Sequence, residues 1–360
     1  MSQEINQSSH QSLFAAESFS SESFQDVALF LCHELRTPLT SIQGALGLLY
    51  TGQLGQLSEE GERVLAIAIS NVNRLSRLAN AIENRPTLPL TVLSDARIEQ
   101  LQLENDLHEA CDRQEFQVLY QPIITADSNQ IVGFEALVRW QHPSRGMISP
   151  TVFIPLAEQI GRIHQLGLWV LKQACQQLYL WQQQFPTHSA LTMSVNLSAL
   201  QLLEPHLVEE VQQILWETQV SPKHLKLEIT ESALIENQEI AIVVLGKLRA
   251  LGIQFYVDDF GTGYSSLGRL QDLPIDVLKI DRSFVQGKQW DISETIVLLA
   301  SKLGLDVIAE GVETVEDLEA LQASGCHKMQ GYLFSKPIDS QAATALMATE
   351  FAIGISPKGS

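Results

Sequence analysis

The first part of the chain carries hydrophobic residues at the three- and four-residue steps of an α-helix. They form two runs joined by TGQLGQLSEEG: Leu31, Leu35, Leu39, Ile42, Leu46 and Leu49, then Leu65, Ala68, Val72, Leu75, Ala79 and Ile82. Such spacing gives each helix a narrow apolar seam that packs against other helices. Because two helices alone bury too little surface, we predict a helical hairpin over residues 23–84 that pairs with a second copy as a four-helix bundle.

The segments around this hairpin differ in composition. Residues 1–22 are rich in serine and glutamine and are predicted to be disordered. The two prolines of NRPTLPLT indicate a linker, assigned to residues 85–95, and a further helix is expected from about Asp95 to Arg113. The main domain is then expected over residues 96–352, followed by a C-terminal tail over 353–360.

Beyond this helix, short β-rich runs alternate with helical stretches. The runs are QVLYQPII, IVGFEALVRW, ALTMSVNLS, LKLEITES, QFYVDDFG, VLKIDRSF, DVIAEGVE and KMQGYLFSKP. Several are apolar almost throughout, as expected for strands buried on both faces. Eight strands with intervening helices predict an α/β fold, a modified TIM (β/α)8 barrel. Since only the short turn ADSNQ joins the first two runs, that pair is expected to be antiparallel.

Most of the predicted strands end in a polar residue, and the carboxyl ends of barrel strands meet at one mouth. These residues are Glu135, Asn196, Glu228, Asp258 with Asp259, Lys279, Glu310 and Gln330. Strand ends that face solvent are polar in any protein. Acids framed by apolar neighbours, as in FEAL and VIAEG, on strand after strand favour a shared site instead.

Carboxylates gathered at one mouth raise one another's pKa, so they must either hold protons or bind cations. Oxygen ligands without histidine or cysteine suit Mg²⁺ or Mn²⁺ better than zinc. Enough acids are present for two ions that share an aspartate, an arrangement suited to displacement at phosphorus. Metal-assisted phosphoester hydrolysis is therefore the first hypothesis from the residues alone.

Charge and cysteine usage narrow the choice of partner and compartment. The formal net charge of -19 argues against a protein that binds DNA non-specifically, although a metal ion can still bring a nucleotide to an acidic site. Cys32, Cys111, Cys175 and Cys326 are scattered and form no CxxC pair, which indicates a reducing compartment. Without a signal-peptide pattern or a run of about 18 apolar residues, a cytoplasmic location with no membrane span is expected.

Residues from about 97 to 352 resemble the EAL domain, the bacterial phosphodiesterase of cyclic di-GMP. The resemblance rests on FEALVRW, SVNLS, LEITES, DDFGTGYSSL, LKIDRSFV, AEGVET and QGYLFSKP, which occur in the family's order. It implies hydrolysis of cyclic di-GMP to linear pGpG with two Mg²⁺ or Mn²⁺ ions. The segment between Lys279 and Glu310 looks shorter than is usual in the family, which would trim a surface helix.

The resemblance also assigns roles to individual residues. The first metal would be bound by Glu135, Asn196, Glu228 and Asp258. The second would share Asp258 and add Asp259 and Glu310. Lys279 would lie beside the attacking water, completing a catalytic set with Glu135, Asp258 and Asp259. The substrate would be held by Arg139, which clamps a phosphate, and by Gln121 and Gln330. Supporting residues would be Glu231, which holds the DDFGTGYSS loop, together with Glu313 and Asp281.

Filled catalytic positions favour a working enzyme over the first of two alternatives. One alternative is a receptor that binds cyclic di-GMP without hydrolysing it. The other is a signalling scaffold that interacts with a two-component system and can coexist with enzyme activity. Turnover in the presence of metal distinguishes the enzyme from the receptor.

The hairpin contains HELRTPL, which resembles the phosphoacceptor box of the histidine-kinase dimerisation domain. The resemblance makes His33 the phosphoacceptor, with Glu34 activating its imidazole and Thr37 positioning water. The alternative is a surface histidine on a dimerising hairpin. No ATP-binding lobe follows, and the glycines of DDFGTGY lie among acids, so self-phosphorylation is not expected. A homodimer that receives phosphate from a separate histidine kinase or response regulator is expected instead.

Overall fold

The computed structural model describes residues 90–349, apart from positions 111, 189, 237 and 263–272. The predicted hairpin, with His33, Glu34 and Thr37, lies outside the described residues, as do the predicted N-terminal segment and C-terminal tail. The chain divides into two compact units, residues 1–102 and 103–360. Helix α3 (Leu90–Ala110) begins and ends earlier than the sequence predicts.

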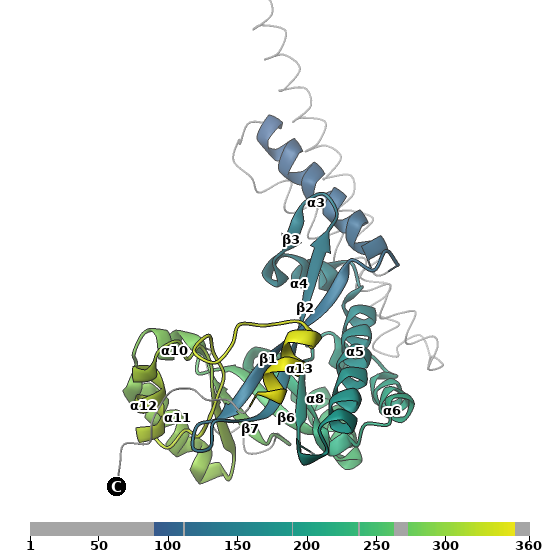
Figure 1. The fold of residues 1–360 in the computed structure, drawn as a ribbon. Helices are drawn as coiled ribbons and strands as arrows, with labels where there is room; N and C mark the ends of the chain where they lie inside the picture. The colour runs from purple at the N-terminus through teal and green to yellow at the C-terminus, as the bar shows by residue number, and fades with distance from the viewer. Residues whose placement is uncertain (1–89, 111, 189, 237, 263–272, 350–360) are drawn as a thin grey trace, which may run out of the picture. The chain divides into compact units, whose positions relative to one another are not determined.

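Within the described residues, the second unit is built around one sheet of nine strands (Figure 1). The strands are β1 (Phe116–Thr125), β2 (Gln130–His142), β3 (Gly146–Ile148), β4 (Thr192–Asn196), β5 (Leu225–Thr230), β6 (Gln254–Phe260), β7 (Val277–Ile280), β8 (Asp306–Ala309) and β9 (Lys328–Met329). Their order is β1-β9-β8-β7-β6-β5-β4-β2-β3, and β1 also pairs with β2. The sheet therefore closes into a barrel, and β3 extends β2 outside the ring.

Strand β1 runs antiparallel to both of its neighbours in the ring, β2 and β9. The other ring strands are parallel. The turn between β1 and β2 is too short for the crossover that a parallel pair requires. The predicted modified TIM barrel with one antiparallel strand is confirmed. The short strand β3 was not predicted, because a three-residue segment that begins with glycine carries no strand pattern.

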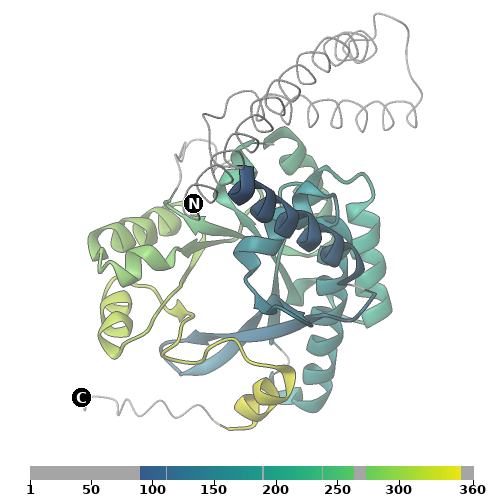
Figure 2. The ribbon, with the colours of Figure 1, turned by 90° about the horizontal axis from the view of Figure 1, so that it is seen from above.

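Helices surround the strands of the second unit (Figure 2). They are α4 (Pro150–Gln159), α5 (Ile163–Gln184), α6 (Leu207–Thr218), α7 (Glu231–Glu236), α8 (Gln238–Leu251), α10 (Arg282–Gln286), α11 (Trp290–Leu303), α12 (Val315–Ala323) and α13 (Ser340–Ala348). Three 3-10 turns add Pro186–His188, Gln201–Leu203 and Pro222–His224. In the described part of the chain, no helix has both the length and the apolar character that crossing a bilayer requires.

Several helices start where the sequence supplies a capping residue. Thr314 and Asp317 form a reciprocal capping box at the start of α12. Asp339 accepts a hydrogen bond from a first-turn amide of α13, and Asp281 does the same for α10. These caps fix where each helix begins after its strand, so they also fix the loops at the barrel mouth.

The barrel interior contains a small apolar layer beneath a polar one. Ile123, Tyr256, Val277 and Ile308 form a buried cluster of their own, separate from the larger core between strands and helices. Residues two positions apart in a strand face the same side. Lys279 therefore follows Val277 into the interior and lies one layer closer to the carboxyl ends of the strands.

Candidate active site

The polar residues at the strand ends meet around the side chain of Lys279, which is fully buried. Its Nζ lies 2.5 Å from Glu228 Oε2, 2.5 Å from Glu310 Oε1, 3.1 Å from Asp258 Oδ1 and 3.7 Å from Glu135 Oε2. Four strands thus contribute acids to one lysine. The structure brings these five predicted site residues together at the barrel mouth, although Glu135 lies in the middle of β2 and not at its carboxyl end.

Amide side chains hold the carboxylate of Glu135 from both sides. Asn196 Nδ2 donates to Glu135 Oε1 at 2.8 Å, and Gln330 Nε2 donates to Glu135 Oε2 at 2.6 Å. Gln330 Nε2 also donates to Gln121 Oε1 at 2.9 Å, and Gln121 Nε2 donates to the backbone carbonyl of Ser335 at 3.1 Å. With both oxygens engaged, Glu135 is fixed in one orientation.

Asp258 and Asp259 are consecutive, and consecutive residues in a regular strand point to opposite faces. The pairing of β6 with β7 shifts register between Val257 and Phe260, and Asp259 adopts a left-handed φ of 54°. This irregularity redirects the strand end. As a result, carboxylate oxygens of Asp258, Asp259 and Glu310 lie within 4.8 Å of one another.

The site carries more negative than positive charge, and the pKa values of its groups reflect this. Burial alone lowers the pKa of Lys279, but Asp258 and the other nearby carboxylates outweigh burial and raise it well above its usual value. Burial, together with the other acids, raises the pKa of Glu228 well above its usual value and that of Glu310 to about 8. Burial and the neighbouring Asp258 raise the pKa of Asp259 to about 6. One ammonium therefore does not neutralise the cluster.

The chemistry of the cluster fits divalent cations. All of its candidate ligand atoms are oxygens, the type that Mg²⁺ and Mn²⁺ prefer. The Oε1 atoms of Glu228 and Gln330 are buried and receive no hydrogen bond from any described residue. Added positive charge would favour the ionised carboxylates and so oppose the burial and mutual repulsion that raise the acid pKa values.

The predicted supporting residues lie in three different settings. Glu231 Oε2 accepts a hydrogen bond at 3.0 Å from the backbone N–H of Gly261, which follows the two aspartates. Asp281 caps α10 and helps to raise the pKa of Asp259. The exposed side chain of Glu313 instead accepts a hydrogen bond from Gln286 at 3.0 Å. Two of the three thus contact or influence the segment that carries the aspartates.

Arg139 lies at the edge of the cluster. Burial lowers the pKa of its guanidinium, while the nearby Glu135 and Tyr332 act in the opposite direction. One guanidinium nitrogen donates to the carbonyl of Val138 at 2.9 Å. The other guanidinium N–H groups remain suited to an anionic oxygen.

Two further groups near this edge are not predicted from the sequence. The Lys336 ammonium lies 5.4 Å from the centroid of the Tyr332 ring, and Tyr332 is 55% exposed. The second group is the backbone carbonyl of Ser335, which accepts from Gln121. QGYLFSKP contains all three residues, but a backbone acceptor leaves no mark in a side-chain pattern.

Comparison with known proteins identifies two family matches. The model described as EAL domain matches residues 104–337, and the model described as His Kinase A (phospho-acceptor) domain matches residues 26–85.

Two relatives of the chain come from Pseudomonas aeruginosa. The bifunctional diguanylate cyclase/cyclic di-GMP phosphodiesterase MucR is 42% identical over 255 residues, covering 69% of this chain and 37% of MucR. The cyclic di-GMP phosphodiesterase NbdA is 42% identical over 245 residues, covering 67% of this chain and 31% of NbdA. The chain therefore spans about a third of the length of these relatives.

A solved structure of the PaMucR phosphodiesterase in complex with c-di-GMP is also similar. It is 41% identical, aligns with a TM-score of 0.64, and covers 67% of this chain and 99% of that chain.

Proposed function

Because the chain belongs to the EAL domain family, we propose that it is a metal-dependent phosphodiesterase that hydrolyses cyclic di-GMP to linear pGpG. The observation that carries the proposal is the cluster of Glu135, Glu228, Asp258 and Glu310 around Lys279. The names of MucR and NbdA, and the ligand in the PaMucR structure, support the choice of substrate.

Two Mg²⁺ or Mn²⁺ ions fit the oxygen ligands of the site. We assign the first to Glu135, Asn196, Glu228 and Asp258. The second would share Asp258 and add Asp259 and Glu310. Carboxylate oxygens of these three residues lie within 4.8 Å of one another. When bound, such ions supply the positive charge that lowers the pKa of water and stabilises charge on the phosphate.

The chain's own residues hold and orient the reactants. Lys279 donates hydrogen bonds inside the cluster and in this role keeps the attacking water aligned with the phosphorus atom. Arg139 binds a phosphate oxygen of the substrate through its guanidinium. Gln121 and Gln330 line the substrate site and, with Asn196, hold Glu135 in place. The burial of Lys279 and Glu228 excludes bulk water from beneath the reacting phosphate.

The test is product analysis on the full chain with cyclic di-GMP and Mg²⁺ or Mn²⁺. We expect linear pGpG by chromatography, and a fall in rate of at least about 100-fold for Glu135→Ala and for Lys279→Ala. Lys288→Ala is the control, because Lys288 pairs with Glu316 on the exposed surface. Binding of cyclic di-GMP without turnover would instead identify a receptor. Retained activity in either site variant would contradict the assigned roles.

We further propose that residues 23–84 dimerise the protein and that His33 accepts phosphate from a separate histidine kinase or response regulator. The match of residues 26–85 to the His Kinase A (phospho-acceptor) domain supports this. Phosphotransfer to the parent chain but not to His33→Ala would support the acceptor role. Light scattering tests the dimer independently, since a monomeric full chain would contradict it.

We also propose the boundaries expected from the sequence, with the hairpin at 23–84, a linker at 85–95 and the EAL domain at 96–352. A cytoplasmic location is part of the same proposal. The thiols of Cys175 and Cys326 are free and buried, which is compatible with a reducing compartment. Cell fractionation tests the location.

A further inference from the structure

Strand β2 leaves the barrel wall after the segment that carries Glu135. Strand β4 pairs with β2 only over Gly133–Ala136, and β3 pairs with it only from Trp140 to His142. Between these segments, β2 is paired on the β1 side alone. Residues 137–148, here called the β2 arm, project beside α4 beyond the ring (Figure 1). Arg139 lies on this arm, whereas Glu135 lies in the wall.

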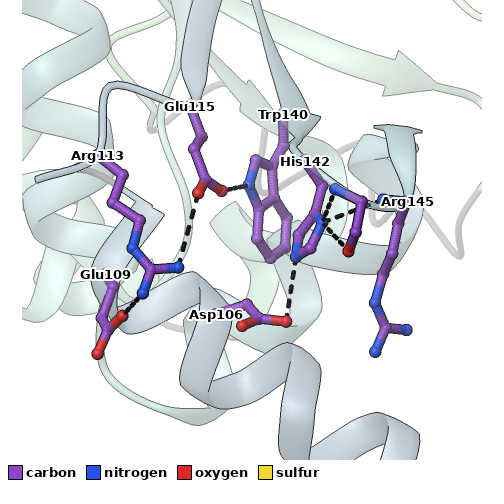
Figure 3. Close-up of polar contacts among 8 residues, drawn as sticks. Asp106, Glu109, Arg113, Glu115, Trp140, His142 and Arg145 are labelled. Carbon is purple, nitrogen blue, oxygen red and sulfur yellow. Dashed lines mark hydrogen bonds and ion pairs between the residues drawn. The ribbon is translucent and has the colours of Figure 1, made fainter.

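The last turns of α3 and the residue that precedes β1 are each joined to the β2 arm by a polar contact (Figure 3). Asp106 Oδ2 is 3.0 Å from His142 Nε2, and Trp140 Nε1 donates to Glu115 Oε2 at 2.8 Å. Asp106 belongs to α3, and Glu115 lies between α3 and β1. We call these two contacts the α3 latch.

Backbone hydrogen bonds and packing make the latch stiff. The N–H of Glu115 donates to the carbonyl of Ala110 at 3.0 Å, and the N–H of Gln141 donates to the carbonyl of Glu115 at 2.9 Å. Ala110 is fully buried, as is Trp140, whose ring packs against Phe153. The end of α3, the start of β1 and the end of β2 therefore form one packed unit.

The hydrogen bonds of His142 determine the direction of its contact with Asp106. Its Nδ1 accepts from the backbone N–H groups of Ser144 and Arg145, each at 3.2 Å (Figure 3). An N–H group can only donate, so Nδ1 carries no proton and Nε2 carries the ring proton. Nε2 therefore donates to Asp106. This buried imidazole connects the turn after β2 to helix α3.

We propose that Asp106 and His142 are positioning residues for Arg139. The α3 latch sets the position of the β2 arm, and Arg139 moves with the arm. Glu135 moves much less, because β1 and β4 pair with its segment on both sides. A displacement of the last turns of α3 therefore changes substrate binding more than the chemical step. This inference rests on the proposed function for the role of Arg139 as a phosphate ligand.

Matched substitutions distinguish the loss of the α3 latch from a general loss of folded structure. His142→Asn keeps an acceptor near the Nδ1 position for the turn but removes the donor to Asp106. Asp106→Ala removes the acceptor, whereas Asp106→Asn keeps an acceptor oxygen. Asn105→Ala is the control on the same helix, since the Asn105 side chain is exposed.

Steady-state kinetics on cyclic di-GMP test the proposal. We expect KM to rise about fivefold in Asp106→Ala and in His142→Asn, with kcat within about twofold of the parent. Asp106→Asn and Asn105→Ala should match the parent. The double variant Asp106→Ala/His142→Asn should be no worse than either single variant, because both break the same contact. An unchanged KM, or a fall in kcat as large as the rise in KM, would overturn the proposal.

Hydrogen exchange supplies a readout that needs no turnover. In Asp106→Ala and His142→Asn, amides of residues 137–142 should lose protection while those of residues 133–136 keep it. Thermal unfolding confirms beforehand that each variant is folded. Unchanged protection of residues 137–142 would overturn the proposal that the α3 latch sets the position of the β2 arm. Changed protection in a chain that does not hydrolyse cyclic di-GMP would reject the proposed function. It would still support the effect of the α3 latch on the β2 arm.

Discussion

Lys279 Nζ lies 2.5 Å from Glu228 Oε2, and solvent reaches 1% of the lysine side chain and none of the glutamate. Removing one partner of a buried ion pair leaves the other charge uncompensated. Here the same ammonium also contacts Asp258 and Glu310. Lys279 is therefore both a candidate catalytic group and the charge that makes an acidic barrel interior stable.

The first prediction concerns Lys279→Met, which preserves much of the side-chain length without the charge. In the presence of a chelator, the free energy of unfolding of this variant should be about 3–5 kcal/mol lower than that of the parent, because several carboxylates lose their counter-charge. Mg²⁺ or Mn²⁺ should restore more stability to this variant than to the parent, since the cluster without its ammonium is more negative and binds the ions more tightly in the folded state. Denaturant unfolding with and without metal measures both effects. Equal stabilisation of the two proteins by metal would contradict this account.

The second prediction concerns Lys226, the second residue of β5, which is buried two positions before Glu228. Its ammonium donates to the carbonyl of Lys223 at 2.6 Å and to Gln254. Burial lowers the pKa of Lys226 from 10.5 to about 8. Between these two pH values the unfolded chain holds a proton that the folded chain has released. Raising the pH through this window therefore increases the stability that Lys226 contributes.

Comparison with Lys226→Met isolates this effect from other groups that titrate at alkaline pH. The stability of the parent relative to the variant should improve steadily from about pH 8 to pH 10.5. Unfolding free energies of both proteins across this range measure the difference. If the plots of unfolding free energy against pH stay parallel for the two proteins, burial does not hold Lys226 deprotonated.

The third prediction compares two glycines. A Cβ at Gly331 would lie 2.1 Å from the carbonyl oxygen of Val312, whereas a Cβ at Gly246 in α8 would meet nothing within 4 Å. Gly331→Ala should destabilise the chain by about 1–3 kcal/mol, and should also weaken substrate binding because Gln330 is the preceding residue. Gly246→Ala should stabilise it by up to about 1 kcal/mol through helix propensity. Unfolding and KM measurements on both variants check the contrast, and equal effects would contradict it.

The sequence predicts well where function depends on strand ends. Glu228, Lys279 and Glu310 lie near the carboxyl ends of separate predicted strands, and the barrel rule alone brings them to one mouth. Glu135 reaches the same mouth from the middle of β2. The antiparallel start of the barrel also follows from the sequence, because ADSNQ leaves no room for a crossover. In these cases the local pattern and the topology indicate the same arrangement.

Other features depend on contacts that no local pattern contains. The left-handed φ of Asp259 arises with a register shift between β6 and β7, so it depends on how two strands pair. Glu313 was expected to support the site, yet its side chain is exposed and bonds to Gln286. The contact between Asp106 and His142 joins a helix to a distant strand end, and neither residue belongs to a recognisable motif.

We propose above all that the oxygen cluster around Lys279 binds divalent ions with which the chain hydrolyses cyclic di-GMP. The most direct measurement strips the full chain with a chelator, titrates Mn²⁺ back, and follows both bound Mn²⁺ and pGpG. We expect no product from the stripped chain, and full turnover as two ions bind per site. Turnover in the stripped chain, or no pGpG at any Mn²⁺ concentration, would contradict the account.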